Sequence, residues 1–138
     1  MRFAGRVFKV DRYWAIEVPI LGVVTQGRTK KEAFEMVADA VESLVNKSGF
    51  RLRVCACRSE YFEIDSDDQA TLIAFLLKRQ RAKNGVTLAE VAARLGAKSH
   101  NAYARYEQGL SVPTVEKFTE LLAAVSPDRD FVLTESDT

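Results

Sequence analysis

The stretch from Thr87 to Pro113, TLAEVAARLGAKSHNAYARYEQGLSVP, constrains the fold of this chain more than any other. Thr87 is followed three residues later by Glu90, a spacing typical of a capping box at the start of a helix. Apolar residues then recur at intervals of three and four, which predicts a helix with one apolar face: Leu88, Val91, Ala92 and Leu95. Gly96 can adopt a positive φ and is expected to end this helix.

A second helix is expected from about Ser99 to Gln108, with Gly109 after its end and Pro113 opening the next helix. Its apolar positions are Ala102, Tyr103 and Tyr106. The pair is typical of a helix-turn-helix whose second helix can enter a DNA major groove. Two short helices joined at a glycine also occur in all-α cores that do not touch DNA.

Positive charge gathers in this part of the chain, although the whole sequence has a formal net charge of only +1. Between positions 78 and 105 a single acid, Glu90, stands against seven cations: Lys78, Arg79, Arg81, Lys83, Arg94, Lys98 and Arg105. DNA phosphates require such a local excess. The alternative interpretation is a solvated helix face, the usual place of a run of charges.

The segment from about Asp68 to Val125 resembles a helix-turn-helix domain of the Cro/C1-repressor (XRE) type. The resemblance is carried by TLAEVAARLG, AYARYEQG and VPTVEKFTELLAAV. It implies DNA binding, and it places Glu107 where the family has a glutamate that supports the end of the recognition helix. The spacing from Gly96 to Tyr103 is one residue longer than usual, which implies a non-standard turn.

Six residues are the predicted DNA contacts, on an operator read by a dimer as an inverted repeat. His100, Asn101 and Arg105 are expected at base edges, because Asn pairs bidentately with adenine and Arg with guanine. Arg94, Lys98 and Ser99 are expected at phosphates. Tyr103 and Tyr106 are assigned to the core. A helix-start residue that faces solvent is the alternative role for His100.

The first half is expected to be an α/β module. Residues 3–10 and 13–18 are rich in aromatic and β-branched residues and predict two strands joined by a turn at Asp11-Arg12, with Val23 and Val24 as a weak extension. Thr29 and Glu32 open a helix with a broad apolar stripe that Gly49 is expected to end. The alternation in residues 50–57 predicts a half-buried strand, and Tyr61 to Ile64 could add another. The pattern is ββαβ.

A polar break at residues 65–68 predicts two domains, residues 1–65 and residues 66–138, and an α+β fold overall. The second domain is expected to be all-α, beginning with a helix at about 68–83 that has four apolar residues on one face: Leu72, Ile73, Leu76 and Leu77. The last helix is expected at 114–125, with Val115, Phe118, Leu121, Leu122 and Val125 inward. Phe131 to Leu133 is interpreted as either a final strand or a dimer contact.

The parts of an active site are missing from the first half. It contains no histidine and no glycine-rich phosphate loop, and the acids of its helix lie opposite the apolar stripe. Cys55 and Cys57 are two residues apart, and no cluster of further ligands accompanies them. We therefore expect no enzyme activity, metal or cofactor. No signal peptide and no apolar stretch of membrane-span length is evident, so a cytoplasmic protein without a membrane partner is expected.

Residues 3–45 resemble the HicB antitoxin family in three elements: YWAIEVP, a TQG loop, and T-x-x-E-A at the helix start. The resemblance implies a partial ribonuclease-H-like ββαβ domain without catalytic acids. It also implies binding of a small HicA-like ribonuclease toxin and repression of the protein's own operon as a homodimer or homotetramer. Five residues are the candidate toxin contacts: Tyr13, Trp14, Glu17, Glu60 and Glu63. The alternative is a plain transcriptional regulator whose α/β half senses a ligand or oligomerises.

Overall fold

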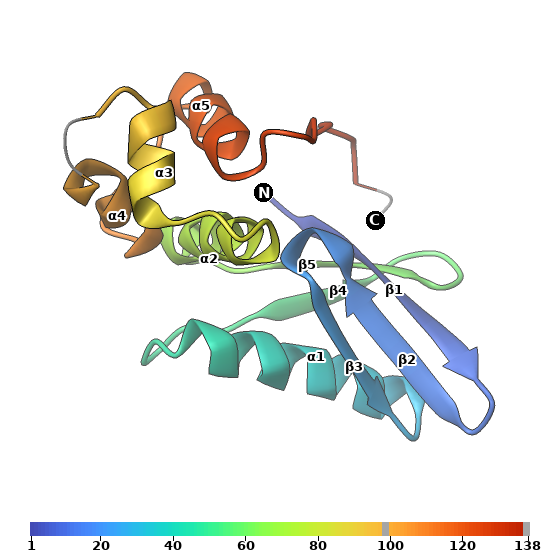
Figure 1. Ribbon diagram of the computed structural model, residues 1–138. Coiled ribbons are helices and arrows are strands. Elements are labelled where there is room, and N and C mark those ends of the chain that lie inside the picture. Colours follow the sequence, from blue (N-terminus) through green and yellow to red (C-terminus); the bar gives the residue numbers. More distant parts are fainter. Residues whose placement is uncertain (98–99, 137–138) are drawn as a thin grey trace. The chain divides into compact units, whose positions relative to one another are not determined.

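The computed structural model describes residues 1–97 and 100–136 and divides the chain into two compact units (Figure 1). The first unit is Met1–Asp68 together with Glu135 and Ser136, and the second is Gln69–Thr134. The division falls three residues after the one expected from the polar break, and the C-terminal end groups with the first unit.

The first unit is built on a five-stranded sheet in the order β3-β2-β1-β5-β4, in which every neighbouring pair is antiparallel. The strands are β1 (Phe3–Val10), β2 (Tyr13–Val18), β3 (Val23–Gly27), β4 (Arg53–Ala56) and β5 (Tyr61–Asp65). A short 3-10 helix, η1 (Pro19–Leu21), separates β2 from β3. The mixed α+β class is confirmed, and the partial ribonuclease-H-like assignment stays a prediction.

The strand count corrects the expected ββαβ pattern. Val23–Gly27 is a full strand paired along its whole length with β2, so the TQG segment is the end of β3 and not a loop. Gly22 adopts φ 61 between η1 and β3, and this tight turn brings β3 back beside β2. After the helix, the strand expected at 50–57 is shorter, Arg53–Ala56, and the further strand at Tyr61 is confirmed.

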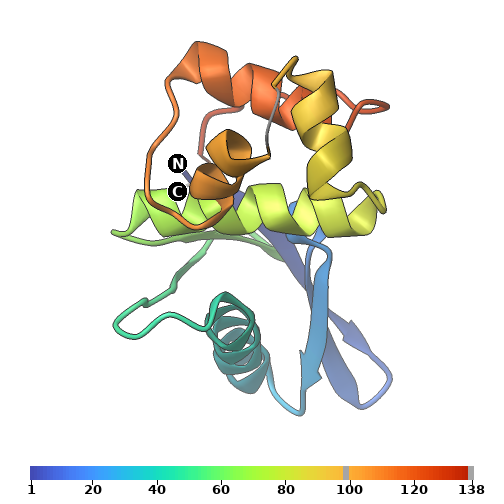
Figure 2. The same ribbon diagram turned by 60° about the vertical axis from the view of Figure 1, so that its left-hand side comes forward.

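Helix α1 (Lys30–Val45) covers one face of this sheet (Figures 1 and 2). Its capping box is confirmed, because the Glu32 amide donates to Thr29 Oγ1 at 3.0 Å. It ends at Asn46, which adopts a left-handed conformation, and not at Gly49 as expected. A Cβ on Gly27 would lie 2.4 Å from the Ala33 amide nitrogen, so only glycine allows β3 and α1 to approach this closely.

The core of the first unit lies between α1 and the covered face of the sheet. Phe34 of α1 meets Phe62 of β5 edge to face, with ring centroids 5.5 Å apart. The other buried side chains of this layer alternate along the strands, as a sheet with one covered face requires: Phe3, Val7, Ile16, Val18 and Ile64, against Ala33, Val37 and Val41.

The second unit consists of four helices: α2 (Gln69–Lys83), α3 (Leu88–Arg94), α4 (Asn101–Glu107) and α5 (Val115–Val125). Helices α4 and α5 both pack on α2, and burial on α2 extends beyond the expected apolar stripe to Thr71 and Gln80. Thr114, rather than Pro113, is the residue that caps α5, where its Oγ1 accepts a hydrogen bond from the Lys117 amide at 3.1 Å.

In the C-terminal part the structure contradicts one expectation and excludes one of the two alternatives for another segment. Val115 is 85% exposed because it occupies the first turn of α5, whereas the inward positions of this helix include Leu121, Leu122 and Val125. Phe131–Leu133 is not a strand, and Val132 and Leu133 are 87% and 97% exposed, so the dimer contact stays a prediction. Among the described residues, none of the helices has the length and apolar character that a membrane span requires.

Candidate nucleic-acid interface

Helix α3 and its C-terminus at Gly96 follow the sequence-based expectation closely, whereas the non-standard turn expected before α4 includes residues that lie outside the described ones. The Glu90 amide donates to Thr87 Oγ1 at 3.1 Å, so the predicted cap is confirmed. Val86 and Val91, on either side of the cap, are both buried. Gly96 adopts φ 71, and the Ala97 amide donates to the Ala92 carbonyl at 2.9 Å, which closes the C-terminus as in a Schellman motif.

Helix α4 is shorter than expected, running from Asn101 to Glu107 instead of 99–108. His100 occupies the N-cap position with helical φ and ψ, and its side chain makes no capping hydrogen bond. Gly109, with φ 72, follows the helix as expected, and the Leu110 amide returns to the Arg105 carbonyl at 3.1 Å. Lys98 and Ser99, two of the predicted phosphate contacts, lie outside the described residues.

The side chains of α4 divide into an inner and an outer set. Tyr103 is buried and Tyr106 is half-buried, which agrees with their assignment to the core. Ala102, expected to be inward, is exposed. His100, Asn101 and Arg105 are also exposed, so the three predicted base-reading residues stand on the accessible surface of this helix.

A buried polar network holds the inner side of α4. Arg81 of α2 donates to both carboxylate oxygens of Glu107, from Nε at 2.6 Å and from Nη2 at 3.1 Å. The Tyr103 hydroxyl, one helical turn before Glu107, donates to the same carboxylate at 2.6 Å. Arg81 Nη1 also donates to the Val86 carbonyl at 3.1 Å, at the entrance to α3. One guanidinium thus links α2, the start of α3 and α4.

Electrostatics explains why this network can be buried. The Glu107 side chain is only 8% exposed, and a carboxylate with so little water needs a charged partner and further donors. Arg81 supplies the charge, and the ion pair raises the pKa of its guanidinium. Burial, followed by the hydrogen bond to Glu107, raises the pKa of Tyr103 far above its usual value, so this phenol remains a neutral donor. The orientation of α4 is therefore fixed from within.

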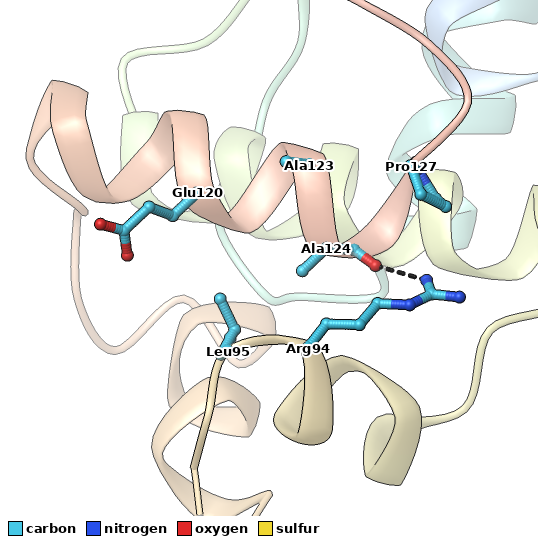
Figure 3. Close-up of a pocket in the computed structure, with 6 residues that line it drawn as sticks. All are labelled: Arg94, Leu95, Glu120, Ala123, Ala124 and Pro127. Carbon is cyan, nitrogen blue, oxygen red and sulfur yellow. Dashed lines mark hydrogen bonds between the residues drawn. The ribbon is translucent and has the colours of Figure 1, made fainter.

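Arg94, another predicted phosphate contact, reaches a neighbouring helix. Its Nη1 donates to the Ala124 carbonyl in the last turn of α5 at 2.7 Å, where the partial negative charge of the helix end favours a cation (Figure 3). The two residues belong to the lining of an open depression between α3 and α5: Arg94, Leu95, Glu120, Ala123, Ala124 and Pro127. The hydrogen bond uses one of the five donors of an exposed guanidinium.

The basic residues counted in the sequence do not form one uniform patch. Lys78 and Lys83 are exposed near the end of α2, whereas Arg79 is half-buried. Arg81 belongs to the internal network, where it is ion-paired with Glu107. Sequence reasoning singled out Glu107 through the family resemblance, but it did not find Arg81 as its partner, because the two are 26 residues apart.

The candidate toxin contacts are spread over both faces of the sheet. Tyr13 is half exposed, whereas Trp14 points to the side of α1, where Lys30 Nζ lies 5.9 Å from its ring centroid. The three acids are all ion-paired: Glu17 and Glu60 with Arg6, at 4.0 and 2.8 Å, and Glu63 with Arg2, at 3.0 Å. Arg6 is a site residue that the sequence did not reveal.

Comparison with known protein families agrees with the geometry of the second unit. A family model described as helix-turn-helix, of the Cro/C1 type, matches residues 77–125. The match includes α3, the turn and α4, and it supports a DNA-binding regulator. No curated protein matches the chain. The resemblance of the first unit to the HicB family therefore stays a prediction.

Proposed function

We propose that this protein is a transcriptional repressor that reads an operator in the major groove with α4. The observation that carries the proposal is the exposed set His100, Asn101 and Arg105 on a helix whose opposite side is fixed by the Arg81–Glu107 ion pair. A recognition helix has to be held rigidly, because base contacts depend on side-chain positions to within a fraction of an ångström. The operator would be an inverted repeat read by a dimer, in which each copy places one such helix in one half-site.

The test is a binding experiment with the full chain and DNA taken from upstream of its own gene. Asn101→Ala and Arg105→Ala should each reduce discrimination against the wrong base by roughly 1–3 kcal/mol. Arg129→Ala, which removes an exposed arginine outside α4, is the matched control and should bind like the wild type. Unchanged operator binding by both α4 variants would show that the recognition helix is assigned wrongly.

We further propose that the first unit makes this repressor the antitoxin of a toxin–antitoxin pair, without being an enzyme itself. The support is the resemblance of residues 3–45 to the HicB family and the position of that segment before a DNA-binding unit. The proposed partner is a small HicA-like ribonuclease, which the first unit would neutralise by covering it. Among the described residues, no group of three or more histidine, cysteine, aspartate or glutamate side chains could hold a metal ion.

The antitoxin role can be separated from repression in cells. Expression of the neighbouring reading frame alone should stop growth, and co-expression of the full chain should restore it. Arg105→Ala should restore growth as well as the wild type while the operon becomes derepressed, because Arg105 belongs to the second unit. A harmless neighbouring frame, or rescue that requires Arg105, would leave only the repressor.

One observation favours a second candidate, a plain regulator whose first unit serves to oligomerise. Glu17, Glu60 and Glu63 are each ion-paired with Arg6 or Arg2, which lessens their power to attract a strongly basic ribonuclease. Growth assays distinguish the two candidates, since only an antitoxin restores growth.

A further inference from the structure

The face of the sheet opposite α1 carries a defined set of side chains. Paired residues of neighbouring strands share a face, and so do residues two apart in one strand. In the strand register, Arg6 lies opposite Glu17 of β2 and opposite Tyr61 of β5. Glu17 in turn lies opposite Val24 of β3. Val10, four residues after Arg6, pairs with Tyr13. All six side chains therefore lie on this one face, which we call the open face.

The open face exposes large apolar groups around a charged centre. Val24 is 71% exposed, Tyr13 and Tyr61 are each 50% exposed, and Val10 is 46% exposed. Such a group of exposed large apolar side chains on one sheet face is typical of an interaction site. Tyrosines are among the residues enriched in protein–protein interfaces, since each combines a large apolar ring with a hydroxyl that stays hydrogen-bonded.

The charged side chains of the open face form ion pairs. At the centre, Arg6 stacks on the Phe8 ring, 4.9 Å from its centroid, and lies between Glu17 and Glu60. Near the end of β5, Asp65 forms an ion pair with Arg53 of β4 at 2.8 Å. A surface of paired charges of both signs is not complementary to a partner of one strong sign. It is complementary to itself, which is the property that a two-fold symmetric interface requires.

We infer that the open face is the surface through which two copies of this chain associate. The two sheets would pack face to face about a two-fold axis, with Val24, Tyr13 and Tyr61 of each copy covered by the other. Arg6 of one copy would then meet carboxylates of its partner in addition to its own. This inference rests on the first unit alone and does not depend on the antitoxin role.

The first test compares two lysine substitutions in the full chain, without DNA, by sedimentation equilibrium. Val24→Lys places a charge in the proposed interface and should weaken self-association at least tenfold. Leu44→Lys alters a side chain of α1 that is 49% exposed and lies off this face, and it should leave self-association unchanged. A monomeric wild-type chain at 100 µM, or equal association by Val24→Lys and the wild type, would overturn the inference.

The second test uses charge exchange between copies. Arg6→Glu makes the open face acidic and Glu17→Arg makes it basic, so each variant alone should associate more weakly than the wild type. Mixed together, the two variants should form a heterodimer, because an acidic face then meets a basic one. Absence of that heterodimer between folded chains contradicts the inference. If Val24→Lys blocks capture of the ribonuclease and leaves self-association unchanged, the open face binds the toxin instead. That result would also overturn the inference.

Discussion

Arg81 of α2 and Glu107 of α4 form a bidentate ion pair, with Nε–Oε1 and Nη2–Oε2 distances of 2.6 and 3.1 Å. The arginine side chain is 21% exposed and the glutamate side chain is 8% exposed. Because Tyr103 shares the same carboxylate, the pair fixes both the position of α4 and its rotation about its own axis. The stability of the second unit and the precision of DNA reading should therefore depend on one buried network.

Glu107→Gln should destabilise the second unit by about 2–3 kcal/mol, since it leaves the Arg81 charge poorly compensated in a site with little water. Urea unfolding of the full chain, followed by circular dichroism, measures the change. Glu120→Gln, which affects only an exposed ion pair with Lys117, should stay within about 0.5 kcal/mol of the wild type. Equal midpoints for the two variants would show that the network contributes nothing.

Tyr103→Phe should cost about 1–2 kcal/mol at neutral pH, because Glu107 loses a donor at 2.6 Å. The pKa of Tyr103 is raised in the folded chain, so its contribution is complete below the unfolded value of about 10 and is lost as the pH rises above it. Above pH 10 the wild type should lose up to about 1.4 kcal/mol per pH unit through this group. Unfolding curves between pH 8 and 11 should therefore converge for the two proteins, and parallel curves would contradict the assignment.

Arg94→Ala should reduce stability by about 1–2 kcal/mol through loss of the hydrogen bond to the Ala124 carbonyl. A phosphate contact has a different signature, since its removal lowers the slope of log binding constant against log salt by about 1. We expect the slope to stay unchanged for Arg94→Ala, because the geometry directs this guanidinium to α5. Binding titrations at several salt concentrations decide between the two roles, and a flattened slope with unchanged stability would restore Arg94 to the phosphate contacts.

Gly27→Ala should destabilise the first unit by about 3 kcal/mol, because the added methyl would overlap the backbone of α1 at Ala33 and force β3 and α1 apart. Gly49→Ala is the useful comparison. It has open space around its Cβ and only a positive φ of 84 to oppose substitution, at a cost of about 1 kcal/mol. Thermal unfolding that ranks Gly49→Ala as the more damaging change would contradict the close approach of β3 and α1.

Local sequence is enough to predict the starts of α1, α3 and α5 and the presence of the helix-turn-helix. Thr29, Thr87 and Thr114 each accept a hydrogen bond from the amide three residues later, and such contacts depend only on neighbours in the chain. The apolar spacing of α3 and the glycine after it are local in the same way. Local signals therefore predicted α3, its turn and the existence of α4 from the residues alone.

Which distant groups meet depends on the packing of the folded chain. Val23–Gly27 becomes a strand because β2 offers it a complete ladder of partners, although its own sequence marks it only weakly. Arg81 belongs to the basic run of the sequence, and only the packing of α2 against α4 places it beside Glu107. The role of Arg6 likewise depends on its ion pairs with Glu17 and Glu60, which lie in two other parts of the chain. Contacts of this kind depend on how segments fold back on each other, and spacing along one segment does not encode that.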